Sequence, residues 1–138
     1  MYSQQVLEHF RQPRNVGDIE NPDGVGQIGD PECGDFLRVT IREEDLHLTD
    51  VRFLCHGCPA AIACASATTE LALGRHVDDA WNVTDDTVLE ALGGLPEQKI
   101  HCSLLGPAAL HAAIMNYVVR GVESDREAAR GSQSPEGV

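Results

Sequence analysis

Three cysteines that lie far apart in the chain occur in short motifs that join them to glycine, histidine or acidic residues. Cys33 lies in Pro-Glu-Cys-Gly-Asp, Cys58 in Cys-His-Gly-Cys-Pro, and Cys102 in Lys-Ile-His-Cys-Ser. Thiolates in such surroundings suit soft metals better than core packing. Separations of 25 residues (33 to 58) and 44 residues (58 to 102) exclude a local zinc knuckle. A shared site therefore requires a tertiary structure that brings three distant segments together.

Two further residues are candidate accessory ligands beside these cysteines. Asp35 offers a hard carboxylate oxygen, which thiolate-loving metals hold weakly, and His101 offers a borderline nitrogen next to Cys102. Weak ligation of this kind suits a metal that must leave again.

The composition limits the size and the partners of the protein. The 138 residues, of which 42% are hydrophobic, suffice for one globular domain and are too few for two. A net charge of -12 repels polyphosphate and anionic lipid, so we expect no nucleic acid and no membrane partner. The first residues lack the pattern of a secretory leader, and no apolar run reaches about 20 residues. Five cysteines in such a chain indicate free or metal-bound thiols in the cytoplasm.

The first half of the chain predicts one helix followed by a hairpin. Apolar residues at helical spacing over 3–11, with Ser3 as cap and Pro13 as stop, predict a short helix. Residues 15–31 favour loops, with room for one short strand around 25–28. Apolar residues then alternate over 36–42 and 51–55, around an acidic turn at 43–45, and predict an antiparallel hairpin with one buried face.

The second half predicts helices. An alanine-rich helix follows Cys58 and ends at Gly74, which places Cys58 at the N-cap, where unpaired amides lower the pKa of a thiol. A short turn at 77–81, a helix over 84–92 and a loop over 95–101 come next. The last apolar helix starts at Ser103 or after a Gly106 cap and runs to about Arg120. We expect a scaffold domain over 1–122 and a disordered acidic tail over 123–138.

Six ordered sequence blocks make the chain resemble the IscU/NifU-type iron-sulfur cluster assembly scaffold proteins from Tyr2 to about Gly121. They are Pro13-Arg14-Asn15-Val16-Gly17, Cys33-Gly34-Asp35, Gly57-Cys58 with Ala61-Ile62-Ala63, Gly94-Leu95-Pro96, Lys99-Ile100-His101-Cys102-Ser103, and Ala112-Ala113-Ile114 leading to Asn116-Tyr117. The resemblance implies an α+β fold in which a three-stranded antiparallel sheet packs against about five helices, in agreement with the elements above.

The resemblance also implies a ligand set and a sequence of steps. A 2Fe-2S cluster would be held by Cys33, Cys58 and Cys102, with Asp35 or His101 completing or modulating the site. A cysteine desulfurase would supply persulfide sulfur to Cys102 or Cys33, and iron would complete the cluster. Recipient apo-proteins, or an Hsp70/J-type chaperone pair, would then collect it. On this reading the protein is a scaffold and not an enzyme, and it is a monomer or a cluster-linked homodimer.

The sequence departs from the family pattern at three places. The stretch Leu95-Pro96-Glu97-Gln98-Lys99 lacks the second proline of the usual chaperone-recognition loop, so dependence on a dedicated chaperone is open. Cys55 is an extra thiol that packs on the buried strand face or joins Cys58 in a CxxC pair, which would favour zinc or a local disulfide. Cys64 is predicted to be a core residue.

Two other classes of function fit the same residues. A structural or regulatory zinc domain would use the three cysteines with Asp35 or His101. A thiol sulfurtransferase or oxidoreductase would cycle Cys55 and Cys58 through a disulfide, although no thioredoxin-like pattern accompanies them. Four other histidines are predicted to be ordinary surface or helix positions without a ligand role: His9, His47, His76 and His111.

Overall fold

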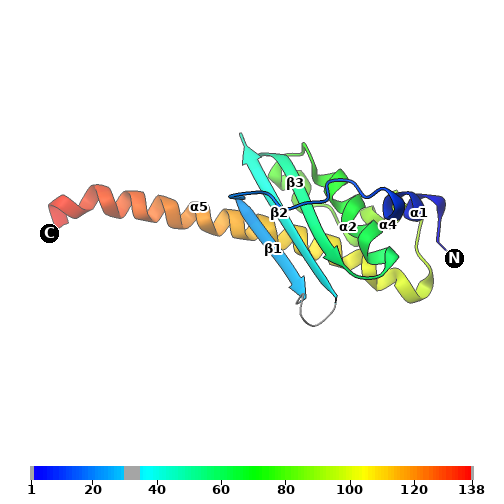
Figure 1. Cartoon of the computed structure of the whole chain (residues 1–138). Coiled ribbons are helices and arrows are strands. Elements are labelled where there is room, and N and C mark those ends of the chain that lie inside the picture. Colours follow the sequence, from blue (N-terminus) through cyan, green and yellow to red (C-terminus); the bar gives the residue numbers. More distant parts are fainter. Residues whose placement is uncertain (1, 30–34, 138) are drawn as a thin grey trace.

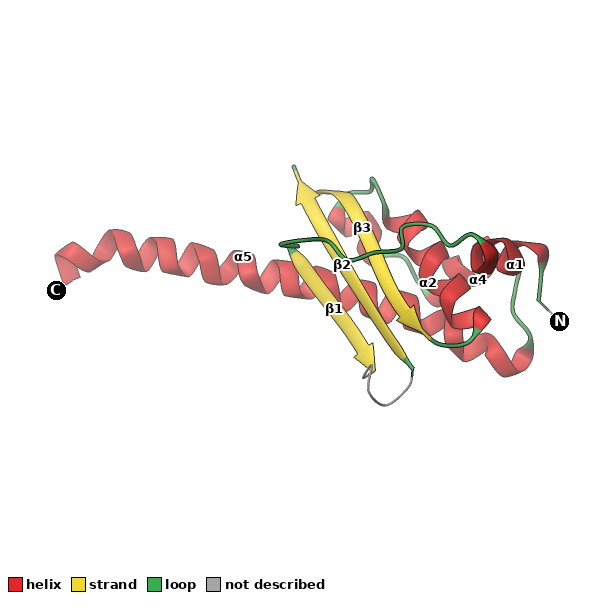
Figure 2. Ribbon diagram, viewed as in Figure 1, coloured by secondary structure: helices red, strands yellow, loops and turns green. Residues whose placement is uncertain are grey.

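A three-stranded antiparallel sheet and a layer of helices form the protein in the computed structural model (Figures 1 and 2). The structure describes residues 2–29 and 35–137, with side chains as far as Ser124. Strands β1 (Gly24–Gly29), β2 (Phe36–Glu44) and β3 (His47–His56) lie in the order β1-β2-β3. This architecture confirms the predicted α+β fold.

The β2–β3 hairpin has one buried face, as the alternation predicts. Leu37, Val39 and Ile41 are buried, and Val39 pairs with Phe53 across the hairpin. The strands are longer than predicted, because pairing continues to Glu44 and His47 around a two-residue turn. Both turn residues, 45 and 46, have positive φ, the conformation that a tight hairpin turn requires.

Two helices begin at the predicted caps. In α1 (Gln4–Arg11) the Ser3 hydroxyl accepts a hydrogen bond from the amide of Val6 at 3.1 Å. Helix α2 (Pro59–Ala72) has Cys58 at its N-cap and proline in its first turn. Small side chains let α2 pack closely on several sides, and Cys64 is fully buried there, which confirms its core role.

The next helices differ from the prediction in one place. Helices α3 (Val77–Trp81) and α4 (Asp85–Leu92) lie where expected, and Gly93 ends α4 with φ 70°. Residues 97–104 form the 3-10 helix η1 (Glu97–Leu104), so the loop predicted over 95–101 is wrong from Glu97 onward. A 3-10 helix has about three residues per turn, so its sequence does not show the 3.6-residue period of an α-helix. In addition, no side chain caps the start of this segment.

Helix α5 (Leu105–Gly137) follows η1 directly, and both predicted start points are wrong. Pro107 is its third residue, where a missing amide costs no intrahelical hydrogen bond. The predicted end before Gly121 is also wrong, because a glycine costs a helix only about 1 kcal/mol and good helix formers follow. The assignment of 123–138 to a disordered tail outside the domain stays a prediction, since side chains beyond Ser124 are not described.

Helix α5 packs across β1 and β2 at very short range. A Cβ at Gly24 or Gly26 would lie 2.2 or 2.0 Å from the carbonyl oxygens of Ala113 and Ala109, so only glycine fits at these two positions of β1. The helical stretch 97–124 would by length and composition alone also suit a membrane span. Its residues Ala109, Ala113 and Ile114 are buried, as in a core helix.

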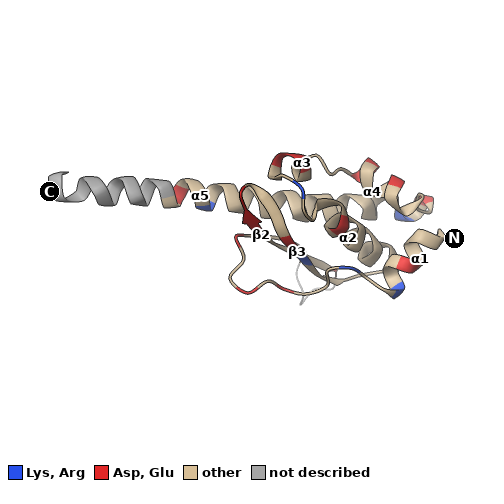
Figure 3. Ribbon diagram, turned by 90° about the horizontal axis from the view of Figure 1, so that it is seen from above, with Lys and Arg blue, Asp and Glu red and all other residues tan. Residues whose placement is uncertain are grey.

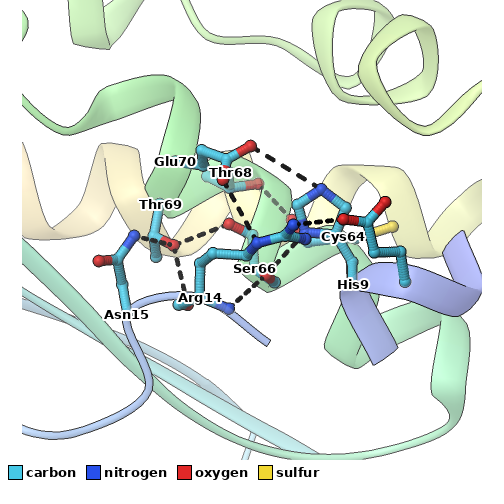
Figure 4. A network of polar contacts seen from close by, with 9 residues as sticks. His9, Arg14, Asn15, Cys64, Ser66, Thr68, Thr69 and Glu70 are labelled. Atoms are coloured by element: carbon cyan, nitrogen blue, oxygen red, sulfur yellow. Dashed lines mark hydrogen bonds and ion pairs between the residues drawn. The ribbon is translucent and has the colours of Figure 1, made fainter. Parts of the chain in front are cut away.

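A buried polar cluster joins α1 and the segment after it to the middle of α2 (Figure 4). His9 Nδ1 lies 2.8 Å from Ser66 Oγ, which also accepts a hydrogen bond from the Arg14 amide at 2.8 Å. Asn15 Nδ2 donates to Thr69 Oγ1 at 3.2 Å. His9 is therefore buried, and the expectation of an ordinary surface or helix position misses its role in this contact.

Candidate metal centre

Two of the predicted ligands meet at the N-terminal end of α2. Cys58 Sγ lies 3.9 Å from Cys102 Sγ, although the residues are 44 positions apart in the chain. Cys58 has an extended backbone because it caps α2, and Cys102 comes from η1, which packs against that helix. Cys58 is half-buried, and Cys102 is almost fully buried.

The surroundings of Cys58 favour its thiolate. Burial acts to raise its pKa, but the backbone amides of Ala61 and Ala60, the thiol of Cys102 and the ammonium of Lys99 together lower the pKa. Unpaired amides at a helix N-terminus carry partial positive charge, which stabilises an anion there. The prediction of a lowered thiol pKa at this N-cap is confirmed.

The surroundings of Cys102 instead raise the pKa of its thiol. Burial, and then the negative charge of Cys58, raise its pKa to about 11, Asp35 adds to that rise, and Lys99 opposes it. Because the two groups interact strongly, they titrate as a pair. With one proton lost from the pair, Cys58 carries the charge and the thiol of Cys102 donates to it.

His101 also lies at this centre. Its Nε2 atom is 3.7 Å from Cys102 Sγ, and its side chain is exposed to solvent. Lys99, two residues earlier, acts on both sulfurs through its charge. A role for Lys99 was not predicted, since the one signal in the sequence is a cation close to a candidate ligand.

Asp35 and Cys55 both lie close to Gly57. A Cβ built on Gly57 would lie 3.8 Å from Cys55 Sγ and 3.9 Å from Asp35 Oδ1, which places both polar atoms beside the residue that precedes Cys58. Both residues also line an apolar pocket of about 170 Å³. Burial, and then the charges of Cys58, Asp35 and Cys102, raise the pKa of Cys55 to about 11, so its thiol stays protonated near neutral pH.

The third predicted cysteine, Cys33, lies outside the described residues. Within 2–29 and 35–124 no group of three His, Cys, Asp or Glu side chains is arranged to hold a metal ion. The described part of the site therefore consists of Cys58 and Cys102, with His101 at their side and Asp35 across Gly57.

The donor set and its spacing fit a thiolate-bound metal. Two thiolates that bind one metal ion at about 2.3 Å with tetrahedral angles lie about 3.8 Å apart. The 3.9 Å between Cys58 and Cys102 requires almost no movement to reach that value. Iron and zinc satisfy this geometry equally well.

The core cysteine and three of the histidines have other surroundings. Burial raises the pKa of the Cys64 thiol to about 12, which keeps it neutral. The rings of His47 and His76 contact each other beside the sheet at 5.4 Å, and His111 stacks on Trp81 at 4.5 Å.

Comparisons with known proteins give one consistent answer. A family model described as "NifU-like N terminal domain" matches residues 1–124. The iron-sulfur cluster assembly scaffold protein IscU 1 of Archaeoglobus fulgidus is 48% identical over 126 residues, covering 91% of this chain and 82% of that protein. The IscU scaffold protein of Escherichia coli K12 is 40% identical over 131 residues, covering 92% of this chain and 98% of that protein.

Solved structures agree on the fold. The crystal structure of a nitrogen-fixing NifU-like protein (N-terminal) from Brucella abortus superposes with a TM-score of 0.68 over 83% of this chain and 92% of that chain. At 17% sequence identity this likeness supports the fold alone.

Proposed function

The chain belongs to the family of NifU-like N-terminal domains, the IscU/NifU-type scaffolds, and from this premise we propose that it holds a 2Fe-2S cluster during assembly and then releases it. Curated relatives that cover most of the chain are named iron-sulfur cluster assembly scaffolds, which supports the scaffold role. The cluster is the cargo of such a protein. Assembly and release of the cluster would take place in the cytoplasm, with a sulfur donor and recipient apo-proteins as partners.

The proposed ligands of the cargo are Cys33, Cys58 and Cys102, with Asp35 or His101 in the remaining position. The single observation that carries this proposal is the 3.9 Å between Cys58 Sγ and Cys102 Sγ, two thiols from distant segments. The stabilised thiolate of Cys58 supports early metal capture, since a thiolate and not a thiol binds metal.

Sulfur would arrive as a persulfide from a cysteine desulfurase, with Cys102 or Cys33 as acceptor. Cys58 accepts the proton of Cys102, the Cys102 thiolate attacks the outer sulfur of the desulfurase persulfide, and the desulfurase thiolate leaves. The product is a persulfide on Cys102. Two electrons from an external reductant then split its S–S bond into the Cys102 thiolate and a sulfide that enters the cluster. Because the thiols return only when the cargo leaves, the protein acts as a scaffold and not as an enzyme.

The direct test is assembly followed by transfer. The full chain is incubated anaerobically with ferrous iron, cysteine and a desulfurase, and then mixed with an apo-ferredoxin. A labile visible chromophore that moves to the ferredoxin is the expected result. Cys55→Ser is the matched control, because it removes a half-buried thiol three residues before Cys58 and should leave assembly in place.

The same experiment separates the proposal from the alternatives. Zinc is the second candidate, because the sulfur spacing suits a tetrahedral Zn²⁺ equally well. A zinc domain would form no chromophore and transfer nothing. A sulfurtransferase that uses Cys55 and Cys58 would turn over without iron and would fail in Cys55→Ser. An Hsp70/J-type pair that accelerates transfer would show that the altered loop before Lys99 is still recognised.

A further inference from the structure

A groove of about 270 Å³ runs between α3 and α5, away from the thiols. It is lined by Val77, Asp78, Trp81, Ile114, Met115 and Val118. Met115 comes ten residues after the first residue of α5, which is about 15 Å along the helix from the end next to η1. Figure 3 shows α3 beside α5, with acidic residues on α3 in red. A ligand in this groove would leave the metal centre free.

Helix α5 presents an apolar stripe that begins in this groove at Met115 and Val118 and continues along the helix. Met115, Val118, Val119 and Val122 follow each other at the i, i+3, i+4, i+7 spacing of one helix face, and each is between 45% and 49% exposed. Valine is a poor helix former, so helix stability does not explain three valines on a solvent-facing stripe. Trp81 is 40% exposed and widens the apolar surface across α3.

The aromatic wall of the groove is fixed before any ligand binds. Trp81 stacks on His111 with ring centres 4.5 Å apart, and His111 Nε2 lies within hydrogen-bond distance, 3.2 Å, of the Val83 carbonyl oxygen. A side chain held in this way loses little rotamer freedom on binding.

The rim of the groove is acidic. Asp78 lines it with a side chain that is 90% exposed and lies 3.7 Å from His76 Nδ1, Asp79 is the next residue of α3, and Glu123 is the next residue after the stripe on α5. Of the residues that the structure describes, no lysine or arginine lines the groove. A second copy of this chain, with a net charge of -12, would place acidic rims against each other. The charge therefore favours a basic occupant.

We propose that the groove between α3 and α5 binds a basic amphipathic helix of a partner protein. Its apolar face covers the stripe on α5 and the Trp81 ring, and its lysines or arginines face the acidic rim. A helix suits the groove because the stripe repeats at helical spacing along α5, as in other helix-in-groove complexes. Affinity comes from the apolar stripe, and orientation and association rate come from the rim.

Trp81 makes the test direct, because it is the only tryptophan in the chain. The probe is a synthetic amphipathic helical peptide of leucine and lysine, about 18 residues or five turns long. A matched peptide carries glutamate in place of every lysine. Titration of the full chain with the lysine peptide should give a saturable blue shift of Trp81 emission, and the glutamate peptide should give none.

Val118→Asp separates groove binding from simple charge attraction. The added negative charge would tighten purely electrostatic binding, whereas groove binding should weaken about tenfold or more, since an apolar contact at the centre is lost. Phe10→Asp is the control, because Phe10 is also partly exposed, at 39%, but lies on α1. Asp78→Asn should weaken binding less and reduce its salt dependence. Far-UV circular dichroism confirms that each variant is folded.

The remaining outcomes overturn the proposal. Equal binding of both peptides would do so, as would unchanged or tighter binding by Val118→Asp, or no binding of the lysine peptide. A concentration-dependent dimer in analytical ultracentrifugation that Val118→Asp dissolves would assign the stripe to a second copy instead.

Discussion

The beginning and the middle of α2 both gather side chains from distant parts of the chain, but they hold them very differently. At the middle, Ser66 Oγ has two partners at 2.8 Å, from His9 and Arg14. At the beginning, the one side-chain partner that the described residues offer Cys58 is the sulfur of Cys102, at 3.9 Å. The two sites are eight residues apart, about 12 Å along one helix.

This difference separates a structural contact from a binding centre. The buried hydroxyls around Ser66 have hydrogen-bond partners within the protein. Among the described side chains, the one buried polar atom without a partner is Arg14 Nη1. These buried hydrogen bonds hold α1 and the segment after it against α2. The thiols form weak hydrogen bonds only, so their capacity to bind metal stays free.

The largest expected effect is on assembly. Cys58→Ser should reduce cluster formation at least about tenfold, since a hydroxyl is a poor ligand for iron compared with a thiolate. Its free energy of unfolding should stay close to that of the wild type, because the sulfur makes no strong contact. Visible absorbance after anaerobic reconstitution measures the first quantity, and urea unfolding measures the second. A large loss of stability would mean that the thiol centre is structural as well.

The reverse pattern is expected at the middle of α2. Ser66→Ala should lower the free energy of unfolding by about 1–3 kcal/mol, because it leaves His9 and the Arg14 amide buried without their partner. Reconstitution of the folded variant should be unchanged. Urea unfolding and the same absorbance assay test both statements, and impaired assembly would show that the two regions are coupled.

Asp35→Ala should act on release more than on assembly. If the exposed carboxylate is a weak ligand that makes the cluster labile, its loss should slow transfer to apo-ferredoxin several-fold and leave the yield of cluster nearly intact. Stopped-flow absorbance during transfer gives the rate. Equal losses in yield and in transfer rate would contradict this labilising role.

The smallest effect concerns pH. Burial, and then the charge of Arg14, lower the pKa of His9 from 6.5, against the opposing charges of Glu70 and Glu8. Below about pH 6.5 the unfolded chain binds the proton more readily than the folded one, so stability should fall as pH decreases. This contribution is fully present above that pH.

Urea unfolding at about pH 7.5 and about pH 5.5 measures this pH dependence. The His9→Gln variant should show a smaller loss of stability between the two values than the wild type. An equal loss in both proteins would assign the pH dependence to other groups.

Much of the fold follows from local patterns. The alternating run after Phe36, the Thr84 cap and the Gly93 stop each depend on neighbouring residues alone, and each lies where predicted. The 3-10 helix and the start of α5 were missed because their geometry comes from packing against α2 and has no periodic signature. His9 was misplaced for a similar reason, since one histidine in an amphipathic helix does not reveal that a serine from another helix faces it.

The sequence by itself determined the family, the α+β architecture and the identity of the candidate ligands, because motifs and periodicity are local properties. Only the tertiary structure decided which of these residues meet. It placed Cys58 beside Cys102, kept His101 at the same centre, added the charge of Lys99 to it, and put Cys55 and Asp35 near Gly57. Distances between segments 44 residues apart depend on how helices pack, and no single segment carries that information.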